Sequence, residues 1–172
     1  MSRLPEITDF QDLFLNDVPL MDTRAPVEFD QGAFPCAENL PLLTDEERHQ
    51  VGIRYKEAGQ DAAIELGYRL VSRSEKERRI EGWLGFARRH PGGALYCFRG
   101  GLRSKLTQEM LAAEAGVVYP RIRGGYKAMR RFLIEATEAA AREVPLVVIG
   151  GRTGVGKTHL INDLAGGIDL EG

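Results

Sequence analysis

The sequence has no long apolar run and only two cysteines among its 172 residues. A membrane helix needs roughly 20 consecutive apolar residues, and no stretch approaches that length. The N-terminal residues, Met1 to Glu6, lack the apolar core and the small-residue cleavage site of a secretory signal. We therefore expect a cytoplasmic protein with no membrane segment, in which both cysteines are free rather than bridged.

The sequence also lacks an overall excess of basic residues, since its net charge is −2. That value argues against a generally basic nucleic-acid binder, but the charge is unevenly distributed. Residues 69–131 hold 15 Lys and Arg against 5 Asp and Glu. Such a region either attracts phosphate backbones or forms solvated helix faces with arginine stems over the core. The candidate contacts to a phosphate backbone lie in an acid-free run and are Arg121, Arg123, Lys127, Arg130 and Arg131.

Strand-like and helix-like patterns alternate along the chain. This order predicts an α/β fold with a largely parallel central sheet flanked by helices. Thr44 and Glu47 have the spacing of a capping box, Gly59 and Gly67 are candidate helix breaks, and Gly116 is a candidate helix end. The predicted strands are 19–22, 94–98, 117–119 and 145–149, and the predicted helical stretches are 44–89, 102–115 and about 126–142.

A domain boundary is predicted at residues 143–145, where an apolar strand leads into a second kind of phosphate loop. The first domain would cover residues 1–143, including a connecting helix at about 126–142, and the second would begin at residue 144. Only 22 residues follow Gly150, whereas a complete P-loop domain needs several more βα units. We therefore expect a fragment that ends inside its second domain.

Cys97 lies at a predicted strand–loop–helix junction. Backbone N–H groups and a helix N-terminus at such a junction favour a thiolate and bind anions. Neighbouring arginines add positive charge, and glycines let the backbone fold closely around an anion. Cys97 is thus predicted to be a reactive nucleophile, and the residues predicted to bind its anionic partner are Arg99, Gly100, Gly101, Arg103 and Ser104.

The spacing Cys-x5-Arg is compatible with two chemistries. One is phosphate-ester hydrolysis through a phosphocysteine, as in a phosphatase or an arsenate-reductase-like domain, and the other is sulfur or selenium transfer through a persulfide. Tyr96 occupies the position where tyrosine phosphatases have a histidine, and no general-acid loop follows. These features favour chalcogen transfer and leave the phosphatase alternative open.

A P-loop motif, G-x-x-x-x-G-K-[ST], spans residues 151–158 after the apolar run. Its backbone would hold a di- or triphosphate through Gly151, Gly154 and Gly156. Lys157 would neutralise the terminal phosphates, and Thr158 is a candidate ligand of Mg²⁺. No acidic strand that would complete a metal site occurs in the 14 residues after Thr158, so tight nucleotide binding is not assured. The scattered histidines predict no other metal site.

Residues 21–24, 28–29 and 32–41 resemble the first half of a rhodanese domain. The resemblance implies that Asp22 and Arg24 brace the active-site loop and that Cys97 is the nucleophile. Cys36 departs from the family pattern, which has a small residue such as glycine there. Cys36 is either a resolving thiol or, more commonly for such a residue, a small packed side chain.

Nearly the whole chain resembles the tRNA 2-selenouridine synthase family, which joins a rhodanese domain to a P-loop domain. The resemblance is carried by residues 96–104, 123–127, the P-loop and residues 169–172. It implies an N-terminal fragment of an enzyme that replaces the sulfur of wobble 2-thiouridine in tRNA by selenium from selenophosphate. The intermediate would be S-geranyl-2-thiouridine made from geranyl diphosphate.

The resemblance also implies roles for the site residues. Cys97 would carry selenium or accept a displaced group, Arg99 and Arg103 would bind the donor, and Lys157 and Thr158 would hold the prenyl diphosphate. The co-substrates would be selenophosphate and geranyl diphosphate, with Mg²⁺ as an optional ion and no tightly bound cofactor. The partners would be tRNA and an enzyme that supplies selenophosphate. A generic sulfurtransferase and a non-catalytic tRNA-binding module remain alternatives.

Overall fold

The computed structural model describes residues 4–145 and 147–169. Its centre is a parallel sheet of five strands, which confirms the predicted α/β class. In spatial order the strands are β1 (Glu6–Ile7), β5 (Arg121–Ile122), β4 (Ala94–Tyr96), β2 (Leu20–Asp22) and β3 (Ala37–Asn39).

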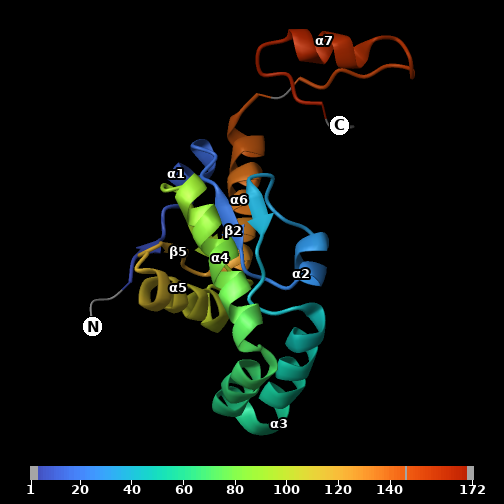
Figure 1. Cartoon of the computed structure of the whole chain (residues 1–172). Coiled ribbons are helices and arrows are strands. Elements are labelled where there is room, and N and C mark those ends of the chain that lie inside the picture. The colour runs from blue at the N-terminus through green and yellow to red at the C-terminus, as the bar shows by residue number, and fades with distance from the viewer. Residues whose placement is uncertain (1–3, 146, 170–172) are drawn as a thin grey trace. The chain divides into compact units, whose positions relative to one another are not determined.

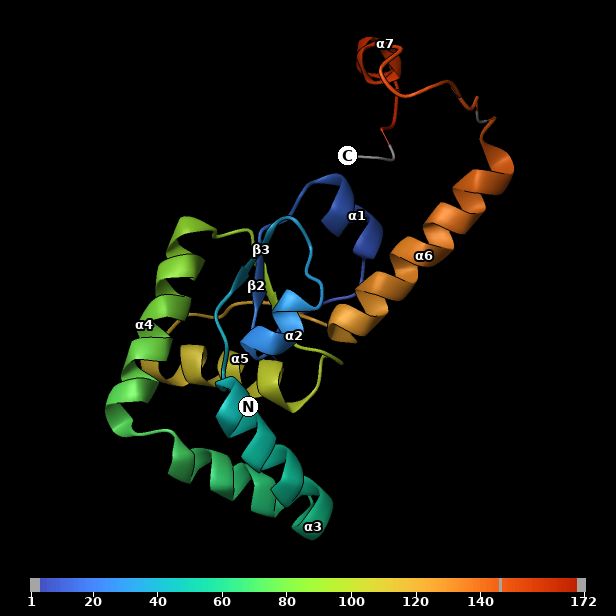
Figure 2. The same ribbon diagram turned by 90° about the vertical axis from the view of Figure 1, so that its right-hand side faces the viewer.

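Helices flank the sheet (Figures 1 and 2). No helix in the described ranges is long and apolar enough to cross a bilayer. The helices are α1 (Phe10–Leu15), α2 (Pro26–Asp30), α3 (Asp45–Leu70), α4 (Arg73–Arg89), α5 (Leu102–Ala115), α6 (Gly125–Glu143) and α7 (Lys157–Asp163).

The strands β2 and β4 are buried on both faces of the sheet. Successive side chains of a strand point to opposite faces, so each of these strands contributes to two core clusters. Met21 and Leu95 join a core cluster with Trp83 of α4 and Leu111 of α5. The alternate side chains of the same strands join a second cluster with α1 and the first half of α6, made up of Leu13, Leu20, Phe34, Ala94, Tyr96, Ile122 and Met129. Both clusters hold the ends of β2 and β4 in place, and the candidate site lies there.

The long helical stretch after β3 divides where the chain turns. Thr44 and Glu47 form the predicted capping box, in which the Thr44 hydroxyl accepts from the Glu47 N–H at 3.2 Å. Gly59 is the predicted break, with φ of 80°. Gly67, by contrast, lies inside α3, and the second break follows α3 instead, where Ser72 caps α4. The prediction at Gly67 was wrong because a glycine only permits a break, whereas a side-chain cap favours one.

The strand predicted at residues 117–119 is displaced to Arg121–Ile122. Tyr119 is buried, but its carbonyl accepts from the Gln108 side-chain amide at 2.8 Å and its hydroxyl donates to the His90 carbonyl at 2.7 Å. Side-chain contacts thus hold this run, and the ladder bonds form two residues later. Propensity favoured residues 117–119, but the neighbouring strands determined where pairing occurs.

The strand predicted at residues 145–149 does not appear in the described part of that run. Val147 and Val148 are 89% and 90% exposed, and Leu146 lies outside the described residues. A strand is stable only when a neighbour takes up its backbone hydrogen bonds, and no described segment pairs with this one. The first compact unit ends at Leu133, inside α6, and the second begins at Ile134. The boundary at residues 143–145 stays a prediction.

Candidate active site

Cys97 directly follows β4 and precedes α5, at the carboxyl edge of the parallel sheet. This edge is where open α/β sheets bind ligands. The thiol donates a hydrogen bond to the Ser104 hydroxyl at 3.2 Å, and that hydroxyl donates to the Gly101 carbonyl at 3.1 Å. Within the described ranges, the N–H groups of residues 98–101 donate to no backbone carbonyl. The loop is therefore able to offer N–H donors to an anion next to the sulfur.

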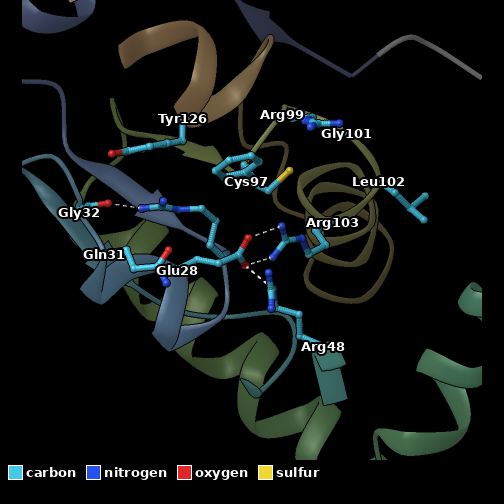
Figure 3. A pocket seen from close by; sticks show the side chains of 12 residues that line it. Glu28, Gln31, Gly32, Arg48, Cys97, Arg99, Gly101, Leu102, Arg103 and Tyr126 are labelled. Carbon is cyan, nitrogen blue, oxygen red and sulfur yellow. Dashed lines mark hydrogen bonds and ion pairs between the residues drawn. The ribbon is translucent and has the colours of Figure 1, made fainter. Parts of the chain in front are cut away.

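Cys97 lines a cavity of about 570 Å³. Figure 3 shows its sulfur lying among side chains from α2, α3 and the loop before α5. Four arginines and a single carboxylate are the charged groups of the lining, so the cavity suits an anionic ligand. The lining residues are Arg24, Glu28, Gln31, Gly32, Arg48, Cys97, Phe98, Arg99, Gly101, Leu102, Arg103 and Tyr126.

Glu28 holds two of these arginines (Figure 3). Its carboxylate accepts two bonds from Arg103, one of them at 3.0 Å, and lies 3.1 Å from Arg48 Nε. Arg103 was predicted to bind the donor anion, but here its guanidinium is paired within the protein. Arg99 is exposed and has no ion pair with any residue that the structure describes. Arg99 is therefore the guanidinium available to a ligand without loss of an existing bond.

The sequence pattern did not indicate Glu28 or Arg48 as site residues. Burial alone would raise the pKa of Glu28, but the hydrogen bonds and charge of Arg103, the Ala25 N–H and the charge of Arg48 outweigh it. They hold the pKa of Glu28 below its ordinary value of 4.5. The ionised Glu28 carboxylate therefore stabilises the folded state at pH values above the unfolded-state pKa of Glu28. This stabilisation is lost as the pH falls through the lower pKa that Glu28 has in the folded state.

Replacement Glu28→Gln is expected to lower the free energy of unfolding at pH 7 by about 2 kcal/mol. A fully buried pair would lose 3–5 kcal/mol, but the Arg103 side chain is 23% exposed. The loss of stability below pH 4.5 should also become smaller, since the titrating carboxylate is gone. Urea unfolding followed by Trp83 fluorescence at a series of pH values measures both effects.

The control for this prediction is Glu38→Gln, because Glu38 makes an exposed pair with Arg89. Exposed pairs contribute about 0–1 kcal/mol, so the control should leave stability nearly unchanged. An equal pH dependence in wild type and Glu28→Gln would show that Glu28 is not the titrating group.

Asp22 and Arg24 form a buried pair at the end of β2. Arg24 Nε lies 2.9 Å from Asp22 Oδ2, and Arg24 Nη2 donates to the Gly32 carbonyl at 2.9 Å. Tyr96 donates its hydroxyl to Asp22 at 2.7 Å. Burial and the Asp22 charge raise the pKa of Tyr96, so its phenol stays a neutral donor. These bonds connect β2 to the residue that precedes Cys97.

A second glycine pair, Gly124 and Gly125, packs against the cysteine loop. The Tyr126 N–H donates to the Cys97 carbonyl at 2.9 Å, and the Lys127 N–H donates to the Phe98 carbonyl at 3.0 Å. Gly125 has φ of 59°, and a Cβ there would lie 2.1 Å from the Cys97 carbonyl oxygen. The sequence shows the two consecutive glycines, but only the fold shows that they pack against the cysteine loop.

The basic run contains one partly buried member and several exposed ones. Arg121 donates to the Gly100 carbonyl at 2.9 Å and pairs with Glu6, with 19% of its side chain exposed. It therefore supports the cysteine loop, in contrast to its predicted place on a tRNA surface. The exposed members are Arg123, Lys127, Arg130 and Arg131.

Cys36 and Cys97 are both free. Cys36 precedes β3 and Cys97 follows β4, so in a parallel sheet they lie at opposite edges. Burial raises the pKa of Cys36, and its side chain packs against the α1 side of the core. These contacts favour the packing role over the resolving-thiol role.

Residues 151–158, predicted to form a P-loop, belong to the second compact unit. Gly154 and Gly156 have φ of 83° and 87°, and α7 begins at Lys157. The Lys157 ammonium donates to the carbonyls of Gly151 and Arg152 at 3.0 and 3.1 Å, and Thr158 is exposed. In the described ranges no cluster of three His, Cys, Asp or Glu side chains could hold a metal. Residues 170–172 of the family resemblance lie outside the described residues.

Curated relatives match nearly the whole chain. The chain is 59% identical to the tRNA 2-selenouridine synthase of Pseudomonas fluorescens Pf0-1 over 97% of its own length and 46% of that protein. It is 60% identical to the Bordetella bronchiseptica protein of the same name over 95% of its length, and 56% identical to that of Marinobacter nauticus over 100%. The chain is thus similar over nearly its whole length to tRNA 2-selenouridine synthases. It spans less than half the length of these relatives.

Among solved structures, the chain is similar to one described as "Crystal structure of N-terminal domain of putative ATP/GTP binding protein from Clostridium difficile 630". The TM-score is 0.67 at 31% identity, and the match covers 75% of this chain and 98% of the other. No family model matches the chain.

Proposed function

We propose that this chain carries the chalcogen-transfer site of a tRNA 2-selenouridine synthase. The observation that carries the proposal is the Cys97 sulfur in an arginine-lined cavity of about 570 Å³, in a chain 56% to 61% identical to synthases of that name. The reaction replaces the sulfur of wobble 2-thiouridine by selenium from selenophosphate, through an S-geranyl intermediate. Loading of Cys97 by a chalcogen donor, seen as a mass gain, tests the proposal.

Cys97 is the nucleophile of a rhodanese-type loop in this proposal. Ser104 accepts a bond from the thiol, and its hydroxyl can rotate to donate to a thiolate once the proton has left. Arg99 and the N–H groups of residues 98–101 bind the oxyanion of selenophosphate. Arg103 has the same role only when a ligand oxygen replaces a Glu28 oxygen. An enzyme that makes selenophosphate would supply the donor.

The P-loop is proposed to hold the diphosphate of geranyl diphosphate. Lys157 is positioned at the loop carbonyls, from which it can turn to a phosphate oxygen. Thr158 offers one oxygen to Mg²⁺, but no cluster of metal-binding side chains in the described ranges completes such a site.

The exposed cations next to the cysteine loop are proposed to bind tRNA phosphates. Joint replacement of Arg123, Lys127 and Arg130 by Gln is expected to weaken tRNA binding. The slope of log binding constant against log salt concentration should become shallower by about 2 to 3, because each phosphate contact contributes about 0.7 to 0.9. Filter binding at several salt concentrations measures the slope.

The control replaces three exposed cations on α3, Arg54, Lys56 and Arg69, by Gln. It has the same change in net charge and should keep the wild-type slope. Equal slopes in the two triple variants would contradict the proposed surface. Binding that is unaffected by Cys97→Ala but accompanied by no chemistry would instead favour the non-catalytic module.

A further inference from the structure

A second cavity, of about 150 Å³, lies between α3, α4 and α5. These three helices lie next to one another in both views (Figures 1 and 2). Its lining is largely apolar and includes Val51, Ala63, Ile64, Trp83, Leu106 and Met110. An apolar cavity of that size accommodates a hydrocarbon group about as large as benzene.

The charged groups in the described lining of this cavity are already paired. Lys76 pairs with Glu114, Arg79 lies 2.9 Å from Glu47, and Arg103 is held by Glu28. Paired charges are poor partners for a further ionic group. The cavity therefore selects a ligand by apolar contact rather than by charge.

The apolar cavity adjoins the cysteine cavity. Leu102 and Arg103, in the first turn of α5, line both. A ligand whose polar end lies beside Cys97 can therefore place an apolar chain across this turn. The small volume does not suit a helix or a second copy of the chain, whereas one five-carbon isoprene unit at the end of a prenyl chain, close to benzene in size, fits it.

We propose that this second cavity binds the apolar chain of a substrate whose polar, reacting end lies in the Cys97 cavity. The inference rests on the proposed function, because there the sulfur that leaves the nucleoside carries a short prenyl chain. Contacts with Ile64, Leu106 and Met110 would hold the chain while the reacting end is aligned with the cysteine loop.

The chain's one tryptophan, Trp83, is a built-in probe, since it lines the cavity. Titration of the 172-residue chain with geranyl monophosphate is expected to change Trp83 fluorescence in a saturable manner. Methyl phosphate, which lacks the apolar chain, should produce no change over the same concentrations. Neither measurement uses the reactivity of Cys97.

Gly67→Leu is the test variant, because Gly67 lines the cavity and leucine would fill it. A Cβ at Gly67 would first meet Val51 Cγ2 at 3.9 Å, an ordinary contact, so folding should be retained. Gly52→Leu is the matched control, a helical glycine of α3 outside the cavity with nothing within 4 Å of an added Cβ. Gly67→Leu is expected to weaken binding at least about tenfold, the factor that corresponds to 1.4 kcal/mol, and Gly52→Leu to bind as wild type does.

Equal affinities in Gly67→Leu and Gly52→Leu, or no saturable change in wild type, would overturn the inference. If Cys97 takes up a chalcogen atom but geranyl monophosphate does not bind, this inference is overturned and the proposed function stands. Probe binding that is lost in Gly67→Leu, with an unmodified Cys97, would support the apolar site and count against the proposed function.

Discussion

Mixing the chain with thiosulfate is expected to add one sulfur atom to Cys97. Cys97→Ala should lose the adduct completely. With thiosulfate, the Cys97 thiolate attacks the outer sulfur, the S–S bond breaks, and sulfite leaves with the electron pair, so a persulfide remains. The arginine-lined cavity and the N–H groups of residues 98–101 should bind the donor and stabilise the leaving anion. Intact-protein mass spectrometry measures the gain.

Cys36→Ala is the matched control for this experiment, because it removes the other thiol. Cys36 lies at the opposite edge of the sheet, so this variant should keep the full adduct. An adduct that follows Cys36, or one that survives in Cys97→Ala, would refute the assignment of the nucleophile. Hydrolysis of an aryl phosphate that disappears in Cys97→Ser, with no chalcogen adduct, would favour the phosphatase alternative.

Gly125→Ala is expected to have the largest structural effect at the site. An added Cβ would lie 2.1 Å from the Cys97 carbonyl oxygen and 2.4 Å from the Gly100 nitrogen, so the cysteine loop would have to move. The left-handed φ of 59° adds strain. We expect a loss of about 3 kcal/mol in the free energy of unfolding. We also expect adduct formation at Cys97 to slow by at least about a hundredfold, since even a 1 Å misplacement has that effect.

Gly116→Ala separates backbone strain from the clash. Gly116 has a similar φ of 66°, but nothing lies within 4 Å of an added Cβ. Its replacement should cost only about 1 kcal/mol and leave adduct formation unchanged. Urea unfolding and the rate of adduct formation are measured on both variants. If the two alanine variants have the same stability and the same rate of adduct formation, the close approach of Gly125 to the loop does not contribute to either property.

The helix after the cysteine loop was predictable because its boundaries are encoded locally. The predicted range 102–115 matches α5, which starts after Gly101 and stops at Gly116 in the left-handed conformation. A glycine at that position ends a helix through the preference of one residue, whatever surrounds it. The capping box of Thr44 and Glu47 held for the same reason.

The partners of the site residues were not predictable in this way. Arg48 reaches Glu28 from the start of α3, and Thr23 donates its hydroxyl to the Tyr96 carbonyl at 2.8 Å across 73 positions in the sequence. Arg48 lies in no recognisable motif, and the rhodanese-like run 21–24 that contains Thr23 does not indicate Tyr96 as its partner. Both contacts exist because parallel strands bring the ends of β2 and β4 to one edge of the sheet.

The sequence by itself determined the α/β class, the cysteine loop and its helix, and the similarity to tRNA 2-selenouridine synthases, because these depend on periodicity and on residues close together in the chain. The tertiary structure alone decided which residues form β5 and that Glu28 pairs with Arg103. It also decided that Arg121 supports the cysteine loop and that an apolar cavity adjoins the Cys97 cavity. The physical reason is the same in each case. Strand pairing, charge pairing and cavities depend on contacts between distant segments, and one residue's preference does not fix its distant partner.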